Sequence, residues 1–171
     1  MTNEYNNCRV IVTYDDYAEN PTDYGGFDVV SFNRRHIAYK HPDEVGLTDP
    51  MCIGLRRKLA TGTAFLLSYY EHGACRWSLA GSGPSCPWDS VDVAGVLYLD
   101  RDVWQGKTYA EREDYARQVL RTYTDWCNGW VHALTLVDGD GEEIESFRGV
   151  FNSDVEDTCA GEFPGAEIVW P

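Results

Sequence analysis

The feature that most constrains the fold is a segment of twenty residues, 108–127, whose apolar side chains recur at helical spacing. Thr108 and Glu111 match a capping box, in which each side chain bonds the free backbone N–H of the other residue. Asn128-Gly129 follows and supplies a left-handed stop. The segment therefore predicts an amphipathic helix that needs a second layer against its apolar face. That face consists of Ala116, Val119, Leu120, Tyr123 and Cys127.

Short stretches rich in β-branched and aromatic residues lie on both sides of this helix and are typical of strands. They are residues 8–14, 27–33, 63–70, 75–79, 93–99, 130–137 and 142–151. The last two flank a polar turn and predict a hairpin. Residues 51–59 fit either a short helix or an extended segment, and the last twenty residues have no clear period. We therefore expect one α+β domain, residues 1–171, with the helix packed on an antiparallel or mixed sheet of about five to seven strands.

The chain carries a net charge of −14, and −9 of it lies in an acidic C-terminal segment, residues 138–171, with ten carboxylates and one cation. A polyanion is repelled by nucleic acid and by anionic lipid, so this charge favours a partner protein with a basic surface. We expect no direct nucleic-acid binding and no membrane binding, although Arg34-Arg35-His36 and Arg56-Arg57-Lys58 could contact phosphate. A salt-adapted cell or a GC-rich genome would produce the same composition without a binding face.

The sequence favours a cytoplasmic location. Its first ten residues lack a cationic region followed by an apolar stretch. The longest apolar runs, such as Val93–Leu99, are too short to span a bilayer. Six cysteines occur without a close pair, and in a reducing compartment they would remain thiols.

Neither a metal site nor a cofactor site is predicted. His72 and Cys75 have the spacing of one zinc-ligand pair, but Cys86 has no neighbouring ligand. A fourth ligand would have to come from Asp89 or from farther away. The chain also lacks a G-x-S-x-G nucleophile elbow and a phosphate-binding loop. We therefore expect no bound metal, no cofactor and no catalytic residue.

The most distinctive local sequence is Ser85–Ser90, in which Pro87 and Trp88 stand in a loop of otherwise small residues. Pro87 fixes its own φ, and Asp89 or Ser90 can hydrogen-bond nearby backbone groups. One interpretation is a rigid contact loop with Trp88 as its anchor, since Trp is frequent among interface hot spots. The other interpretation is that Trp88 packs back onto the core.

Several segments carry a likeness to known proteins. They are Tyr14-Asp15-Asp16-Tyr17, Asn20-Pro21, Phe32-Asn33-Arg34-Arg35, the 65–79 hairpin, the Cys86-Pro87-Trp88-Asp89-Ser90 loop, Tyr115, Tyr123 and the hairpin that begins at Trp130. Together they resemble a group of small acidic proteins encoded by bacteriophages, especially phages of actinobacteria and firmicutes. The likeness covers about residues 10–150, while the segment between Arg35 and Phe65 and the tail after Asn152 depart from it or extend it. The resemblance implies expression in the cytoplasm of an infected bacterium, and it assigns no catalytic residue.

The first functional hypothesis is a non-enzymatic phage accessory protein that binds and modulates a host protein, such as a nuclease or another anti-phage defence factor. Its acidic surface would mimic the charge of nucleic acid. The expected partner-binding residues are Trp88, Asp89, Glu142, Glu143, Glu145, Asp154, Glu156 and Asp157.

Two alternatives stay open at this stage. One is an enzyme that acts on a small molecule or nucleotide through the Cys86–Asp89 loop. It requires a deep polar pocket in which a set of chemically capable side chains converge. This set is Arg34, Arg35, His36, His72 and Cys86. The other alternative is a structural or assembly protein of the virion, which an obligate oligomer would favour. The sequence leaves the oligomeric state open.

Overall fold

The computed structural model describes residues 5–171, and within them the chain forms eight strands and four α-helices. The α+β class expected from the sequence is confirmed. The expectation of one sheet with five to seven strands is wrong, because the strands form two sheets of four strands each. Alternating side chains indicate which face of a strand is buried, but they do not indicate which strands pair.

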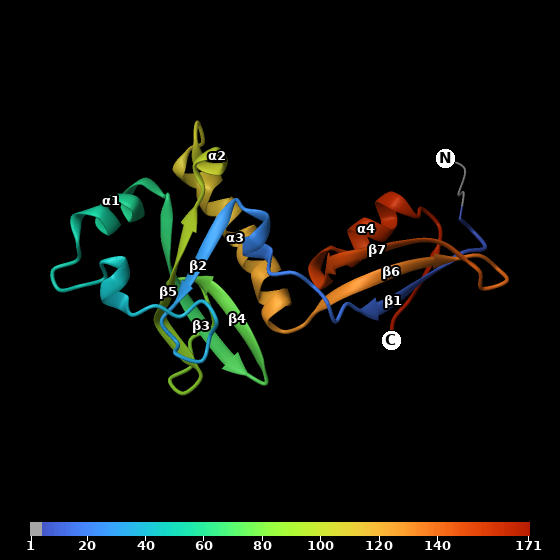
Figure 1. Cartoon of the computed structure of the whole chain (residues 1–171), viewed down its shortest axis with the longest axis horizontal. Helices are drawn as coiled ribbons and strands as arrows, with labels where there is room; N and C mark the ends of the chain where they lie inside the picture. Colours follow the sequence, from blue (N-terminus) through green and yellow to red (C-terminus); the bar gives the residue numbers. More distant parts are fainter. Residues whose placement is uncertain (1–4) are drawn as a thin grey trace. The chain divides into compact units, whose positions relative to one another are not determined.

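The chain divides into two compact units, and each contains one of the sheets (Figure 1). Unit 1 combines residues 5–20 with residues 125–171, so it is built from both ends of the chain. Unit 2 is the segment Pro21–Thr124. The sequence-based expectation of a single domain stays a prediction.

The sheet of unit 1 has the strand order β7-β6-β1-β8. Strand β1 (Arg9–Tyr14) pairs antiparallel with β6 (Val131–Val137) and parallel with β8 (Glu167–Val169). Strand β7 (Glu143–Phe151) pairs antiparallel with β6 and forms one edge of the sheet. The predicted hairpin around residues 138–141 is therefore present.

Helix α4 (Val155–Glu162) follows a single 3₁₀ turn, η3 (Asn152–Asp154), and packs on this sheet. Its buried residues are Val155 and Cys159, four positions apart. Two buried positions in eight residues are too few to establish a helical period, so the sequence pattern did not predict α4 or the three-residue β8. The core beneath the helix consists of Val10, Val12, Leu134, Leu136, Val155, Cys159 and Phe163.

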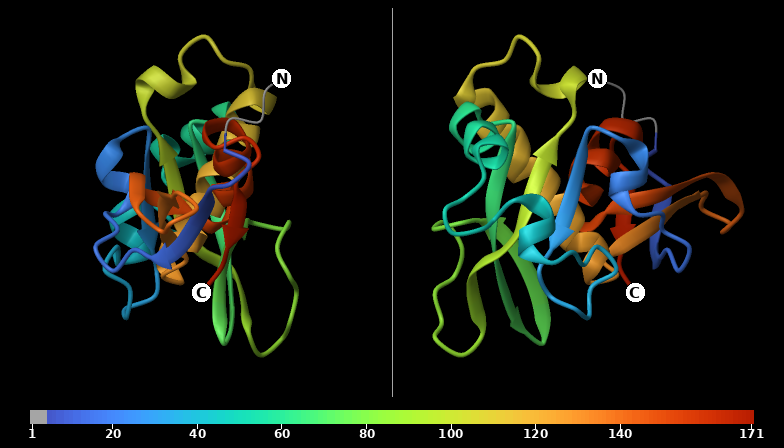
Figure 2. Two further views of the ribbon diagram at one scale, coloured as in Figure 1. Left: turned by 90° about the vertical axis from the view of Figure 1, so that its right-hand side faces the viewer. Right: turned by 60° about the vertical axis from the view of Figure 1, so that its left-hand side comes forward.

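The sheet of unit 2 is antiparallel throughout, with the order β2-β5-β3-β4. Its strands are β2 (Phe27–Ser31), β3 (Ala64–His72), β4 (Ala74–Leu79) and β5 (Ser90–Leu99). The long loop that leaves β4 and returns as β5 is visible beside the β3–β4 hairpin in Figure 2. This loop carries the Cys-Pro-Trp-Asp-Ser sequence.

Helix α3 (Tyr109–Cys127) confirms the predicted helix, and Gly129 adopts the left-handed conformation after it with φ +69°. Its side chains pack on the sheet of unit 2, since the ring of Tyr109 lies 5.9 Å from Phe65 and that of Tyr123 lies 6.1 Å from Trp77.

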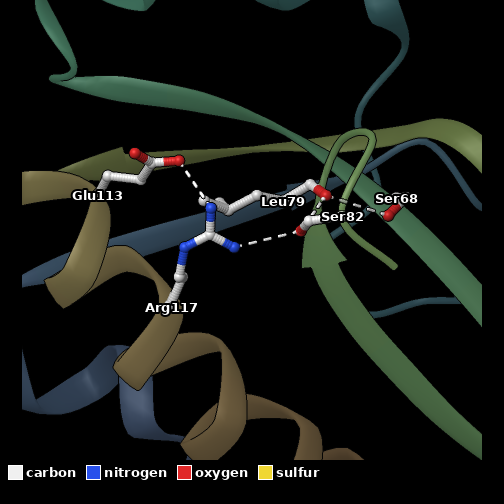
Figure 3. A network of polar contacts seen from close by, with 5 residues as sticks. All are labelled: Ser68, Leu79, Ser82, Glu113 and Arg117. Carbon is white, nitrogen blue, oxygen red and sulfur yellow. Dashed lines mark hydrogen bonds and ion pairs between the residues drawn. The ribbon is translucent and has the colours of Figure 1, made fainter. Parts of the chain in front are cut away.

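A polar network also fastens α3 to the end of β4 (Figure 3). Arg117 donates to Glu113 over 2.7 Å and to the Ser82 hydroxyl over 3.3 Å. Ser82 in turn donates to the Leu79 carbonyl over 2.8 Å, and Ser68 donates to the same oxygen over 3.4 Å. The helix is therefore attached to the sheet by polar contacts as well as by its apolar face.

Residues 51–59, for which the sequence allowed either a short helix or an extended segment, contribute to helix α1 (Ile53–Thr61). Its Leu55 packs with Ala64 and Val96. Ala64 packs with α1, and Phe65 contacts Tyr109 of α3. Because neighbouring residues of a strand point to opposite faces, the two helices lie on opposite faces of β3. The remaining short helices are η1 (Pro21–Tyr24), η2 (Pro42–Val45) and α2 (Arg101–Trp104).

The capping box of α3 gives a direct test of the fold. The Glu111 N–H donates to the Thr108 hydroxyl, and the Thr108 N–H donates to Glu111 over 2.7 Å. We expect Thr108→Ala to lower the free energy of unfolding by about 1 kcal/mol, measured by urea denaturation. Thr122→Ala is the matched control, because Thr122 lies inside the same helix and bonds only the Gln118 carbonyl. Equal losses in the two variants would contradict the cap.

Candidate functional site

The first candidate site is the acidic tip of the β6–β7 hairpin. Asp138 organises the turn, because its Oδ1 accepts hydrogen bonds from the backbone N–H groups of Asp140 and Glu142, both at 2.9 Å. This turn leads directly into the exposed start of the edge strand β7. The turn and strand therefore expose three of the predicted partner-binding residues, Glu142, Glu143 and Glu145.

Three more of the predicted carboxylates lie at the opposite end of β7. Asp154, Glu156 and Asp157 are exposed residues at the start of α4, which begins only three residues after the strand ends. Strand β7 runs from Glu143 to Phe151, and eight steps along a strand span roughly 27 Å. The six carboxylates thus form two separate acidic groups rather than one continuous row.

None of these six carboxylates forms an ion pair within residues 5–171. Arg148, the one cation of residues 138–171, has its Nη1 3.8 Å from the buried carboxylate of Asp15. The Gly149 N–H also donates to Asp15, over 3.1 Å. No ion pair within residues 5–171 therefore offsets the charge of the two acidic groups.

The second candidate site is the loop before β5. Trp88 is 92% exposed, so the interpretation in which it packs on the core is wrong. Beside it, Asp89 Oδ2 accepts a hydrogen bond from the Cys86 thiol and lies 3.4 Å from His72 Nδ1. The structure therefore brings together two members of the predicted ligand pocket, Cys86 and His72, through Asp89.

His36 belongs to a different group. Its Nδ1 lies 2.8 Å from the Ser31 hydroxyl, and its ring lies 5.1 Å from Tyr69 and 5.6 Å from Trp77. Burial lowers the pKa of His36 below its usual 6.5, and the nearby charge of Glu71 opposes this shift. Burial, together with the charges of Cys75 and Glu71, raises the pKa of Tyr69 well above its usual value.

The predicted ligand pocket is consequently divided. Tyr69 and Glu71 share one face of β3, while His72 points to the other face because side chains alternate along a strand. His36 lies against the Tyr69 face and Cys86 lies near His72. Arg34 and Arg35 are exposed in the turn after β2. The five residues do not converge on one polar pocket.

Sequence reasoning missed a buried histidine in unit 1. His132 is 2% exposed, and its Nε2 lies 3.1 Å from Asn152 Oδ1, which can only accept a hydrogen bond. Its ring is flanked by Tyr14 at 5.2 Å and Trp170 at 5.5 Å. Within residues 5–171 its Nδ1 has no hydrogen-bond partner. A polar residue inside a predicted strand gave no signal that it would be buried.

Comparison of this chain with protein-family models, with curated proteins and with solved structures found no match. Across residues 5–171, no group of three or more His, Cys, Asp and Glu side chains is arranged to hold a metal ion. No helix in this part of the chain has the length and apolar character needed to cross a membrane.

The lowered pKa of His36 predicts a pH dependence of stability. The folded state binds this proton less tightly than the unfolded state, so stability is retained above pH 6.5 and falls as the pH drops through this value. We expect NMR titration to give His36 a midpoint below 6.5. We also expect His36→Phe to flatten the acid-side loss of unfolding free energy.

His72→Gln is the control for this measurement, because His72 is exposed and should leave the acid-side loss in place. A titration midpoint of His36 at or above 6.5 would contradict its burial against the rings of Tyr69 and Trp77.

Proposed function

We propose that this protein is a non-enzymatic phage accessory protein that binds a host protein with a basic surface and modulates or inhibits it. The observation that carries the proposal is the group of exposed carboxylates at the β6–β7 hairpin, none of which is ion-paired within residues 5–171. Such a group attracts a cationic surface and repels nucleic acid and anionic lipid. The bacteriophage context comes from the sequence resemblance alone.

The density of charge at the hairpin indicates the class of target. Residues 138–145 contain five carboxylates, which are Asp138, Asp140, Glu142, Glu143 and Glu145. Nucleic-acid-binding proteins use Arg and Lys to contact successive phosphates, and a row of carboxylates competes for the same cations. We therefore expect the target to be a nuclease or another nucleic-acid-binding defence factor, and we expect duplex DNA to displace it.

The two acidic groups should contribute unequally. Glu156 and Asp157 lie in the first turn of α4, where negative charge interacts favourably with the helix dipole. Charge on the edge strand β7 also discourages pairing with another sheet edge. Glu143 and Glu145 lie on β7 itself, whereas the side chain of Glu142, in the turn before the strand, has neither role, so we take the hairpin as the better candidate for binding.

The enzyme alternative has weaker support. Its favourable observation is the contact of Cys86 and His72 with one carboxylate, Asp89. A nucleophilic thiolate needs a cationic neighbour or a base that leaves it charged, whereas Asp89 would repel a thiolate. We therefore treat this group as a structural support of the loop.

The test substitutes Gln for Glu142, Glu143 and Glu145 and compares this hairpin variant with the wild type as bait in host lysates. We expect the wild type to retain a nucleic-acid-binding protein at low salt and to release it on addition of duplex DNA or salt. An exposed ion pair contributes about 0.5 kcal/mol, so loss of three, about 1.5 kcal/mol in all, should weaken the affinity about tenfold. Affinity for the purified partner is measured by calorimetry.

A second variant replaces Asp154, Glu156 and Asp157 by their amides, and we expect it to lose less affinity but some stability of α4. The charge-matched control is Asp23→Asn, Asp102→Asn and Asp114→Asn, three exposed positions of unit 2. Equal loss in the control would mean that net charge, rather than the hairpin, controls binding. Unchanged affinity in the hairpin variant would refute the mimicry mechanism.

A further inference from the structure

The loop Pro84–Ser90 is closed by its own hydrogen bonds. The Ser90 hydroxyl donates to the Pro84 carbonyl and accepts from the Cys86 N–H, both over 2.9 Å. The Ser90 N–H donates to the Cys86 carbonyl over 3.0 Å. Ser90 therefore bonds both Pro84 and Cys86 across a seven-residue loop, and Pro87 further restricts the backbone.

Asp89 fastens the same loop to the sheet. Its carbonyl accepts from the Glu71 N–H over 3.0 Å, and its carboxylate contacts the Cys86 thiol and His72. The loop is thus closed on itself by Ser90 and attached to β3 through Asp89. None of these contacts buries Trp88, whose side chain lies almost wholly in solvent.

A fixed loop with an exposed Trp is suited to binding. An interface loses affinity when it has to immobilise side chains and loops, and a loop that is already ordered avoids most of this cost. Trp is also the residue type most enriched among interface hot spots. Val91 and Val93, which follow in β5, are 52% and 43% exposed and extend the apolar character of this region.

The geometry favours a partner that receives the Trp88 side chain over a partner that adds a strand to this sheet. The pairing of β3 with β5 passes from Leu67–Gly95 to Tyr69–Val91, so Ser68 alone is opposite three residues of β5. This bulge includes Asp92 and Val93 and interrupts the regular ladder that an added strand would extend. A partner would therefore make contact mainly through a pocket that receives Trp88.

The local charge indicates the character of this pocket. Residues 77–100 contain no Lys or Arg, and Asp89 and Asp92 are close in sequence to the exposed Trp88 and Val91. Carboxylates so placed repel anionic lipid and nucleic acid and favour cations at the edge of a contact. We propose that the loop Pro84–Ser90 is a preorganised docking loop whose Trp88 enters an apolar pocket with a basic rim on a partner protein.

This docking loop belongs to unit 2, whereas the acidic hairpin belongs to unit 1. The inference therefore stands whether or not the hairpin carboxylates bind a target. It also assigns a role to Cys86, Asp89 and Ser90, which position the loop and need not touch the partner.

The test places the photoreactive amino acid p-benzoylphenylalanine at position 88 of the full chain and irradiates it in lysates of an actinobacterium and a firmicute. We expect a crosslink to one protein, at an apolar residue with Lys or Arg close by, as mapped by mass spectrometry. A crosslink to a second copy of this chain, to lipid, or to a surface without cations would overturn the proposal. No crosslink would also overturn it.

Affinity for the purified crosslinked partner gives the second readout. We expect Trp88→Ala to weaken binding at least about tenfold, and Trp88→Phe to restore part of it. Ser90→Ala, which keeps Trp88 but opens the loop, should weaken binding less. Because Trp88 is exposed, Trp88→Ala should leave the urea midpoint unchanged. Full affinity of Trp88→Ala would overturn the proposal.

The hairpin variant with Gln at positions 142, 143 and 145 separates the two proposals. If it binds the crosslinked partner normally while Trp88→Ala does not, the docking loop is supported and the hairpin does not contribute to binding this partner. If the hairpin variant loses binding while Trp88→Ala retains it, the charge mimicry is supported and the docking loop is overturned.

Discussion

The pairing of β1 with β6 is the interaction on which the rest of the structure depends. It joins residues 9–14 to residues 132–137 and so closes both ends of the chain into one sheet. Strand β6 then supports the acidic hairpin through β7, and β1 supports the tail through β8. Because residues 21–124 lie between the two paired segments, unit 2 is an insertion within unit 1. Closing so long a loop costs chain entropy, which the buried apolar residues of β1 and β6 offset.

Local signals allowed the sequence to predict some parts of this structure. Helix α3 has a capping box, a regular apolar face and a glycine stop within about twenty residues, and the 138–141 turn has its hairpin signal within four. The division into two sheets depends on contacts between distant segments. The alternation of apolar and polar residues along a strand does not specify which strands pair. The sequence also did not predict the exposure of Trp88, because a Trp beside a Pro is compatible both with a loop packed on the core and with an exposed loop.

The acidic residues have several different physical roles in the structure. Carboxylates at the start of α4 stabilise the helix, and those on β7 protect a sheet edge. Asp89 and Asp138 order loops by accepting hydrogen bonds. The side chain of Glu142, in the turn before β7, has neither an ion pair within residues 5–171 nor one of these structural roles. Charge alone therefore does not identify a binding site, but unneutralised charge on a fixed turn is a reasonable basis for proposing one.

The account treats charge and apolar contact as separable, with the charge on unit 1 and the exposed Trp on unit 2. The salt dependence of the affinity for a purified partner tests this most directly, because salt screens exposed charges and leaves apolar burial nearly unchanged. We expect the hairpin variant to reduce the slope of log affinity against log salt. We expect Trp88→Ala to lower the affinity at every salt concentration without changing this slope. A hairpin variant with the wild-type slope would contradict the account, and so would a Trp88→Ala variant with a flattened one.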